Sequence, residues 1–484
     1  MTEGKVLVVQ LARLGDMVQT WPLLRRLRHQ DPGRPLDLLA DRPLSVLHTL
    51  GPDLDHIWEV DLAGLPTQSQ GDLSGAYARV RDLAEGFAGR NYDLVYNLNF
   101  SRVSLLLSYL AGREVRGSRP VKGGREFLRE PWLALVYALV HARQINRVHL
   151  SDVFRHLAPV VEHEPWPATP AVKEGEPIIA LQMATRHPKR TWPLEAFTRL
   201  AALLVNRLGA RVWLVGTKAE APLGEALTEG LTPAQRERVI NLQGRTDLLE
   251  LAARLRLAHL LVSGDTGTLH LAAALGTRTM GVFLGPASCF ETGPYGEGHY
   301  VFQAEPPCHP CTEAGAACLE PFCQAMIPPE AVADLAVSLG TRAEPPALPP
   351  LPAGTRLYRS VFDPLGVTYA PLGAGHRFID LMGFAYRRAG AQLLGLAWPV
   401  SQAHSYTFCE DDWWNLERLG AALKNGSRSG ISPPLATFLT PLQAYREEFQ
   451  RQRMLGRDAT EAEFCLAAVE KGFRAGLEEL RAAG

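Results

Sequence analysis

The sequence lacks several features that mark other classes of protein. Its 484 residues carry 50 basic and 51 acidic side chains, so a general attraction to nucleic acid is not expected. The N-terminus has no charged segment followed by a long apolar run, and therefore does not resemble a signal peptide. The longest apolar candidate, residues 130–144, is too short to span a bilayer and predicts a buried or interfacial helix. We expect a cytoplasmic protein that could touch a membrane only at its surface.

What is present is the composition of a globular protein with a full core. Hydrophobic residues make up 46% of the chain and charged residues 21%, and the length predicts two or three domains. Short apolar strands alternate with helical segments in two successive stretches, which predicts two doubly wound α/β units facing a common ligand crevice. Proline-rich segments at 162–177 and 342–354 interrupt this pattern. The predicted domains are 1–165, 166–341, and a proline-rich linker with a mainly helical extension at 342–484.

A group of small polar residues follows the apolar run Leu260–Val262, where a predicted strand becomes a helix. Its candidate binding residues are Asp265, Thr266, Gly267 and His270. The first turn of a helix has free N–H groups and partial positive charge, so this segment is suited to a phosphate. The alternative is simple capping by Asp265 or Thr266, with His270 as a core histidine.

Two further loops occupy equivalent places after the first strand of each unit. Asp16 follows Gly15, which permits a tight turn, and its carboxylate could take a proton from an acceptor hydroxyl or simply cap the next helix. Lys189 and Arg190 precede Trp192 and could neutralise a diphosphate, or could lie exposed in solvent.

Together these segments resemble the ADP-heptose:lipopolysaccharide heptosyltransferases of glycosyltransferase family 9, over residues 4–340. The strongest element is SGDTGTLHLAAALGTRTMGVFLGP, followed by TGPYG at 292–296. The LGD…WPLLRRLR opening and the K…WP segment occur in the expected order. No predicted strand ends in G-x-G-x-x-G, which argues against a dinucleotide-dependent dehydrogenase.

The resemblance implies a GT-B fold, inverting transfer of heptose from ADP-heptose to the lipopolysaccharide inner core, and no metal in catalysis. Asp16 matches the proposed base of the family, and the segment containing Asp265 matches its donor-diphosphate site. Lys189 matches the phosphate lysine, but this chain has K-x-x-W where the family has K-x-W, so Arg190 is an alternative. Glu220 matches the family's ribose- or heptose-facing glutamate. Two other functions compete with this interpretation. The protein could be a GT-B glycosyltransferase that uses another nucleotide sugar, or a non-catalytic carbohydrate-binding or assembly protein on the same scaffold.

The acceptor implied by the resemblance is strongly anionic, and the basic segment 112–130 suits it or lipid headgroups. Its candidate acceptor-binding residues are Arg113, Arg116, Arg119 and Lys122. A solvated basic loop is the equally weighted alternative.

Four of the seven cysteines form a C-x2-C-x6-C-x4-C pattern: Cys308, Cys311, Cys318 and Cys323. Four thiolates can close a tetrahedral zinc site, and an iron–sulfur cluster uses the same ligands. We expect a structural zinc ion with no part in the transfer chemistry; an iron–sulfur cluster and free or disulfide-bonded cysteines are the alternatives.

Overall fold

The structure is a computed structural model that describes residues 4–63, 73–120, 127–161, 167, 170, 173–312, 318, 321–340, 347–399, 406, 409–425 and 431–483. The chain divides into two compact units. Unit 1 comprises Met1–Asn146, Leu150–Glu164 and Phe378–Gly484, and unit 2 comprises Arg147–His149 and Pro165–Arg377. None of the helices in the described part of the chain has the length and apolar character needed to cross a membrane.

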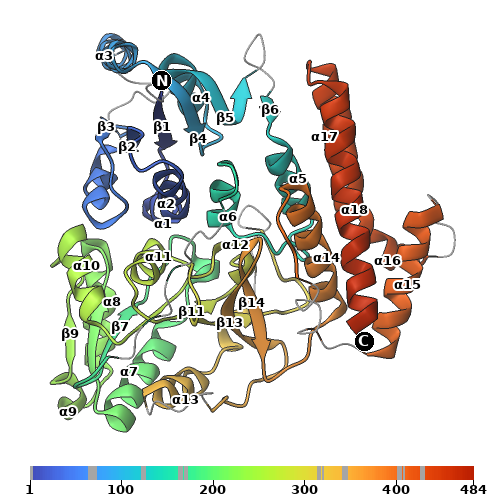
Figure 1. Ribbon diagram of the computed structural model, residues 1–484. Helices are drawn as coiled ribbons and strands as arrows, with labels where there is room; N and C mark the ends of the chain where they lie inside the picture. The colour runs from blue at the N-terminus through green and yellow to red at the C-terminus, as the bar shows by residue number, and fades with distance from the viewer. Residues whose placement is uncertain are drawn as a thin grey trace. The chain divides into compact units, whose positions relative to one another are not determined.

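Unit 1 contains a six-stranded sheet of order β3-β2-β1-β4-β5-β6 (Figure 1). The strands are β1 (Lys5–Gln10), β2 (Leu36–Asp41), β3 (His56–Val60), β4 (Tyr92–Asn97), β5 (Gly112–Pro120) and β6 (Phe127–Arg129). All pairs are parallel except β5 with β6. The strand order reverses between β1 and β4, the position where α/β sheets bind ligands.

The helices of this part of unit 1 connect the strands and complete its core. They are α1 (Leu14–Gln19), α2 (Trp21–Gln30), η1 (Arg42–Leu50), α3 (Leu73–Arg90), α4 (Arg102–Ala111), α5 (Pro131–Val140) and α6 (Leu150–Arg155). Helix α5 comes from the apolar segment at 130–144 and buries seven of its ten residues, so it is a core helix.

Unit 2 contains an eight-stranded sheet of order β14-β13-β12-β11-β10-β7-β8-β9. Its strands are β7 (Ile178–Gln182), β8 (Arg211–Val215), β9 (Val239–Asn241), β10 (Leu260–Ser263), β11 (Thr279–Phe283), β12 (Tyr300–Ala304), β13 (Thr355–Asp363) and β14 (Gly366–Leu372). Strands β7 to β12 are parallel, and their order reverses between β7 and β10. Loops after these two strands are therefore brought to one edge of the sheet.

Helices and short 3-10 turns cover this second sheet and supply much of its apolar core (Figure 1). They are η2 (Pro188–Arg190), α7 (Leu194–Leu208), η3 (Lys218–Glu220), α8 (Ala221–Glu229), α9 (Pro233–Arg236), α10 (Leu248–Leu257), α11 (Gly267–Ala274), α12 (Cys289–Thr292), η4 (Phe322–Ala325) and α13 (Pro329–Gly340). Buried side chains such as Phe197, Leu214 and Phe302 form a continuous core on this sheet.

The segment 342–484, predicted as one mainly helical extension, is divided by the structure. Strands β13 and β14 form a hairpin that pairs antiparallel with β12 and extends the sheet of unit 2. Asp363 accepts hydrogen bonds from the backbone N–H groups of Leu365 and Gly366, which closes the turn. The β-branched and aromatic residues of this stretch satisfy the edge of an existing sheet, a tertiary pairing that local composition did not reveal.

The chain becomes helical only from Phe378, and this helical part belongs to unit 1. Its helices are α14 (Phe378–Leu393), α15 (Glu410–Asn425), α16 (Pro433–Ala436), η6 (Thr437–Leu439), α17 (Thr440–Met454) and α18 (Ala459–Ala483). Helices α14 and α18 lie side by side (Figure 1). A Cβ atom added to Gly472 or Gly476 would lie 2.7 or 2.8 Å from a Cα atom of α14, so these glycines permit the close approach.

Candidate active site

The turn between β10 and α11 presents the N-terminus of a buried helix at the edge of the unit 2 sheet. Thr266 is the N-cap, and its Oγ1 atom accepts a hydrogen bond from the backbone N–H of Leu269. The hydroxyl oxygen atoms of Ser263 and Thr266 lie 2.8 Å apart and share a hydrogen bond. Of the two capping residues considered from sequence, the structure uses Thr266 and leaves the Asp265 carboxylate for other contacts.

Asp265 connects two basic groups at this turn. Its Oδ2 atom accepts a hydrogen bond from Nη1 of Arg190 at 2.6 Å, and its Oδ1 atom lies 3.7 Å from Nε2 of His270. The Asp265 side chain is 7% exposed and that of His270 is 4% exposed. Within the described residues, the buried Nδ1 atom of His270 has no hydrogen-bond partner. A buried polar atom of this kind is satisfied when a ligand or water reaches it.

The two basic residues of the preceding loop have different surroundings. Arg190 contacts the β10–α11 turn, whereas the Nζ atom of Lys189 lies 3.4 Å from the carbonyl oxygen of Thr312 and lines a separate cavity. In this structure Arg190 is therefore the residue of the K-x-x-W segment that reaches Asp265. Gly264 packs closely against the loop, because a Cβ atom there would lie 2.8 Å from Cγ2 of Thr185.

Glu220 is joined to the same edge of the sheet through a residue that sequence reasoning missed. Gln182, the last residue of β7, donates to Glu220 Oε2 at 2.8 Å and accepts from Thr268 of α11 at 3.3 Å. Gly216 has a φ of 155°, and a Cβ there would lie 2.0 Å from the Glu220 carboxylate. Gln182 is a polar residue at the end of an apolar strand, next to the point where the strand order reverses. That position was the signal that could have identified it as a candidate site residue.

Asp16 lies in unit 1, beyond the carboxyl end of β1. The turn predicted at Gly15 is wrong, because α1 already begins at Leu14 and both Gly15 and Asp16 lie in its first turn. Asp16 is half-buried and its Oδ2 atom accepts a hydrogen bond from the backbone N–H of Arg13 at 3.2 Å. Its own carbonyl accepts from Thr20, so the carboxylate is held on a short, well-anchored helix.

A partly buried amide network supports the loop that precedes Asp16. Gln10 accepts hydrogen bonds from Asn99 at 2.6 Å and from the backbone of Ala12, and it donates to Thr20. Asn99 in turn accepts from the backbone of Leu11 at 2.7 Å. Because this network joins the ends of β1 and β4, it positions the Asp16 loop at the reversal of strand order in unit 1.

Three of the four predicted acceptor-binding residues lie on a strand and not in a loop. Arg113, Arg116 and Arg119 are exposed on β5, where side chains alternate between the two faces, so Arg116 is on the opposite face from the other two. Arg116 forms an ion pair with Glu114 at 2.8 Å. Lys122 lies outside the described residues.

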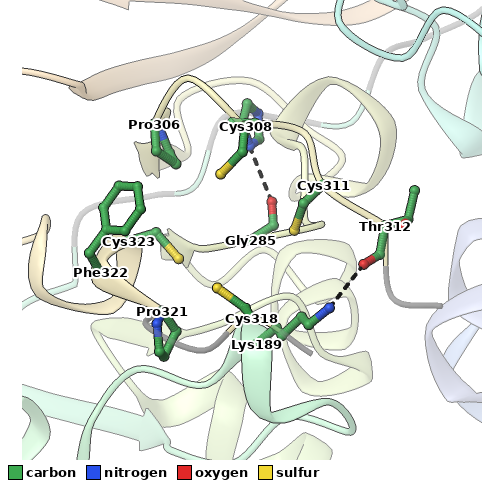
Figure 2. A pocket seen from close by; sticks show the side chains of 11 residues that line it. Lys189, Gly285, Pro306, Cys308, Cys311, Thr312, Cys318, Pro321, Phe322 and Cys323 are labelled. Atoms are coloured by element: carbon green, nitrogen blue, oxygen red, sulfur yellow. Dashed lines mark hydrogen bonds between the residues drawn. The ribbon is translucent and has the colours of Figure 1, made fainter. Parts of the chain in front are cut away.

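The four cysteines of the C-x2-C-x6-C-x4-C pattern line one cavity of about 240 Å³ together with Lys189 (Figure 2). All four are free thiols. Burial raises the pKa of Cys323, and negative charge on Cys311, Cys318 and Cys308 raises it further. Among the residues that the structure describes, no three histidine, cysteine or acidic side chains are arranged to hold a metal ion. The predicted metal site therefore stays a prediction.

Comparison with known proteins gives a consistent result. The sequence profile of glycosyltransferase family 9 (heptosyltransferase) matches residues 80–320. The chain is 24% identical to lipooligosaccharide heptosyltransferase 2 of Haemophilus influenzae over 308 residues, which covers 60% of this chain and 85% of that protein. It is 27% identical to lipopolysaccharide heptosyltransferase 1 of Pseudomonas aeruginosa over 324 residues, or 63% of this chain and 86% of that protein.

Solved structures support the GT-B fold predicted from sequence. ADP-heptose lps heptosyltransferase II of Escherichia coli has a TM-score of 0.51 at 19% identity and covers 70% of this chain and 100% of its own. The family 9 glycosyl transferase of Veillonella parvula has a TM-score of 0.53 at 16% identity and covers 71% of this chain and 99% of its own. With its two Rossmann-like units and these relatives, the chain is similar to glycosyltransferase family 9 over residues 80–320 and is a glycosyltransferase.

Proposed function

We propose that this protein transfers heptose from ADP-heptose to the inner core of lipopolysaccharide, with inversion at the anomeric carbon, at the cytoplasmic face of the inner membrane. The observation that carries the donor assignment is the Arg190–Asp265–His270 group at the N-terminus of α11. The relatives named for heptosyl transfer to lipopolysaccharide or lipooligosaccharide support the choice of sugar and acceptor.

The diphosphate of the donor is assigned to the first turn of α11. Free backbone N–H groups and the helix dipole favour negative charge there, and the guanidinium of Arg190 adds a cation. Asp265 acts as a positioning residue in this scheme, because its carboxylate holds Arg190 and would repel a phosphate placed directly beside it. The buried Nδ1 atom of His270 is available to a donor oxygen.

These groups supply the stabilisation that the leaving group requires. When the bond between the anomeric carbon and the β-phosphate oxygen breaks, negative charge grows on ADP. The helix N-terminus and Arg190 then interact more strongly with the leaving group than with the intact donor, which lowers the barrier without a catalytic metal.

Asp16 is assigned as the base that takes the proton from the attacking acceptor hydroxyl. Its carboxylate is half-buried at the carboxyl end of β1 and is held by the backbone N–H of Arg13. A carboxylate fixed in this way loses little conformational freedom when an acceptor hydroxyl approaches. Attack on the face opposite to the departing ADP inverts the anomeric configuration.

An apolar stripe on unit 1 supports the predicted contact with a membrane surface. Phe100, Leu106 and Tyr109 are 71%, 51% and 70% exposed, and the last two project from α4. Arg102, the first residue of α4, and Arg113, the second residue of β5, are also exposed. Apolar side chains next to basic residues suit an anionic lipid surface, where the rings and leucine enter the interface and the arginines meet headgroups.

Parallel calorimetric titration of the full-length protein with ADP, UDP, GDP and CMP tests the donor assignment. Selective binding of ADP is the expected result, followed by release of ADP from ADP-heptose in the presence of a truncated lipopolysaccharide acceptor. Preference for another nucleotide would replace the donor but keep the fold and the site. Binding of none of the four would overturn the proposed function.

A further inference from the structure

We propose that Glu448, on the C-terminal helix α17, is a positioning residue for sugar transfer. It holds one end of a path of hydrogen bonds and strand pairings that crosses the sheet of unit 1 and ends at the loop bearing Asp16. The proposal rests on the proposed function, since it takes Asp16 as the base. It gives the C-terminal helices a part in the reaction, and all the residues involved belong to unit 1.

The path begins at a closed ring of contacts around Arg129, the last residue of β6. The Nη1 atom of Arg129 lies 2.7 Å from Oε1 of Glu448, and the same oxygen accepts a hydrogen bond from Gln452 at 2.6 Å. Gln452 accepts from Nε of Arg457 at 2.9 Å, and Nη2 of Arg457 donates to the carbonyl oxygen of Arg129. The C-terminal helices therefore hold both the side chain and the backbone of this strand.

The ring is buried and remains charged. The side chains of Glu448 and Arg457 are 6% and 4% exposed, and Gln452 is fully buried. Burial by itself would raise the pKa of Glu448, but hydrogen bonds outweigh this effect and lower the pKa to about 2. The donors are Arg451, Gln452 and Arg129. Because the carboxylate is ionised at any ordinary pH, loss of one partner would leave the other charge largely buried and uncompensated.

Strand β6 passes this constraint to β5. Arg129 is paired with Ser118 in the antiparallel ladder, next to the candidate acceptor-binding residue Arg119. Strand β6 has three residues, and a pairing this short is marginal by itself. The contacts with Glu448 and Arg457 therefore contribute to fixing the end of β5.

From β5 the path continues to β4. The Nδ2 atom of Asn97 donates to the carbonyl oxygen of Ser118 at 3.4 Å, and its Oδ1 atom accepts from the backbone N–H of Asn99 at 3.1 Å. The two strands approach closely here, because a Cβ atom added to Gly117, whose φ is 99°, would overlap the carbonyl oxygen of Asn97. A displacement of β5 would therefore be transmitted to Asn97.

Asn99 completes the path to the loop bearing Asp16. It donates to Oε1 of Gln10 at 2.6 Å and accepts from the backbone N–H of Leu11 at 2.7 Å. Gln10 donates from Nε2 to the carbonyl oxygen of Asp16 at 3.5 Å. Every step from Glu448 to Asp16 is thus a hydrogen bond or a strand pairing within unit 1.

This path gives Glu448 an effect on the base and not on the donor. A base acts only within hydrogen-bond reach of the acceptor hydroxyl, and a displacement of about 1 Å can cost about a hundredfold in rate. Loss of the ring should let β6 and β5 move, so that the loop bearing Asp16 occupies a wider range of positions. We expect slower transfer with unchanged ADP affinity, since the assigned diphosphate site lies in unit 2.

The first test removes the ion pair without leaving a lone charge. The double substitution Arg129→Met and Glu448→Met introduces two apolar side chains, a change that buried ion pairs often tolerate. Arg388→Met with Glu479→Met is the matched control, because this largely buried pair at 3.1 Å joins α14 to α18 and lies outside the path. Circular dichroism should show that both variants are folded.

Hydrogen exchange of backbone amides reports on the path independently of activity. The N–H of Leu11 is bonded to Asn99, so peptides covering residues 8–17 should exchange about fivefold faster in Arg129→Met/Glu448→Met and at an unchanged rate in the control. Asn97→Ala interrupts the path at its middle and should have the same effect with the C-terminal helices intact. Unchanged exchange in both path variants would overturn the proposal.

Steady-state transfer from ADP-heptose to a truncated lipopolysaccharide acceptor gives the functional measurement. Arg129→Met/Glu448→Met should lower kcat about tenfold while ADP affinity in calorimetry stays within about threefold. The control should match the unaltered protein in both quantities. Unchanged kcat, or a loss of ADP affinity as large as the loss of kcat, would overturn the positioning role.

The two proposals fail in distinguishable ways. An unaltered protein that transfers no heptose would overturn the proposed function, while faster exchange in the path variants would still support the link between Glu448 and the Asp16 loop. Transfer by the unaltered protein, with kcat and exchange unchanged in the path variants, would keep the function and overturn the role of Glu448.

Discussion

The Nη1 atom of Arg190 lies 2.6 Å from the Oδ2 atom of Asp265, and this ion pair joins the loop after β7 to the first turn of α11. Both strands end at the position where the order of the unit 2 sheet reverses. The pair therefore places a cation beside a helix N-terminus, where an anionic ligand gains from both.

Arg190→Ala should weaken ADP binding more than Lys189→Ala. The guanidinium reaches the β10–α11 turn, and loss of a charge-assisted hydrogen bond costs about 1.5–3 kcal/mol, or roughly tenfold to a hundredfold in affinity. Calorimetric titration with ADP measures the effect, and Arg186→Ala provides a control on an exposed neighbouring arginine. A larger loss in Lys189→Ala than in Arg190→Ala would assign the phosphate contact to the lysine.

Asp16→Asn should lower the rate of sugar transfer by about 10²- to 10⁴-fold, the usual contribution of a general base. The amide keeps the size of the side chain but cannot take up the proton. Affinity for ADP should stay within about threefold, because the residue is assigned to the acceptor and not to the donor. Asp53→Asn, at an exposed position of the same unit, should leave both quantities unchanged. Normal turnover in Asp16→Asn would remove this residue from the mechanism.

The double substitution Leu106→Ser and Tyr109→Ser should reduce binding to vesicles that contain phosphatidylglycerol. These side chains are 51% and 70% exposed, and transfer of an apolar side chain into the interface is worth about 1.5–3 kcal/mol. Co-sedimentation with vesicles measures binding, and Leu257→Ser, also on an exposed helical leucine, is the control. Absence of vesicle binding by the unaltered protein would contradict the membrane contact.

Gly476→Ala should destabilise unit 1 by about 1–3 kcal/mol, the cost of overpacking a close contact. The new methyl group would lie 2.8 Å from Cα of Ala385 on α14, and backbone moves less easily than a side chain. Urea unfolding followed by circular dichroism gives the change. Gly420→Ala is the matched control. A Cβ atom added at Gly420 would have no described atom within 4 Å outside its own helix and chain neighbours. This substitution should therefore stabilise the helix by up to about 1 kcal/mol. Equal effects of the two substitutions would contradict this account.

Unit 2 should lose stability as the pH falls below about 6.5, the ordinary pKa of histidine. Burial, together with the smaller effect of the positive charge of Arg278, lowers the pKa of His299 to about 3. Between these two pKa values the unfolded chain binds a proton that the folded chain does not, so a fall in pH favours unfolding. Above about 6.5 the ring is neutral in both states, and the free energy of unfolding no longer changes with pH through this residue. The Nδ1 atom also accepts a hydrogen bond from the backbone N–H of Thr279, which requires the neutral ring.

Urea unfolding at pH values from 7.5 to about 4.5 measures this dependence, with an upper slope of about 1.4 kcal/mol per pH unit for one group. His299→Gln should flatten the pH dependence even though it lowers stability at pH 7. His29→Gln, on the exposed end of α2, should leave the slope unchanged. An unaltered slope in His299→Gln would show that another group controls the acid response.

The sequence alone determined the two α/β units and the loops to which we assign the chemistry. Alternating apolar strands and helices, proline-rich breaks and the Asp265–His270 segment were all readable, because periodicity and helix-start signals are local properties of the chain. The same local pattern identified the cysteine segment but did not decide how its thiols meet.

The tertiary structure decided which side chains contact one another. It joined Arg190 and not Lys189 to Asp265, inserted Gln182 between Glu220 and Thr268, and paired residues 355–372 with the unit 2 sheet. It also brought Gln324 to the backbone of the basic loop. Each of these contacts joins residues that lie far apart in the sequence. They form only because the strand order and the close packing at particular glycines bring those residues together. Local composition carries no record of such pairings, so only the folded chain specifies them.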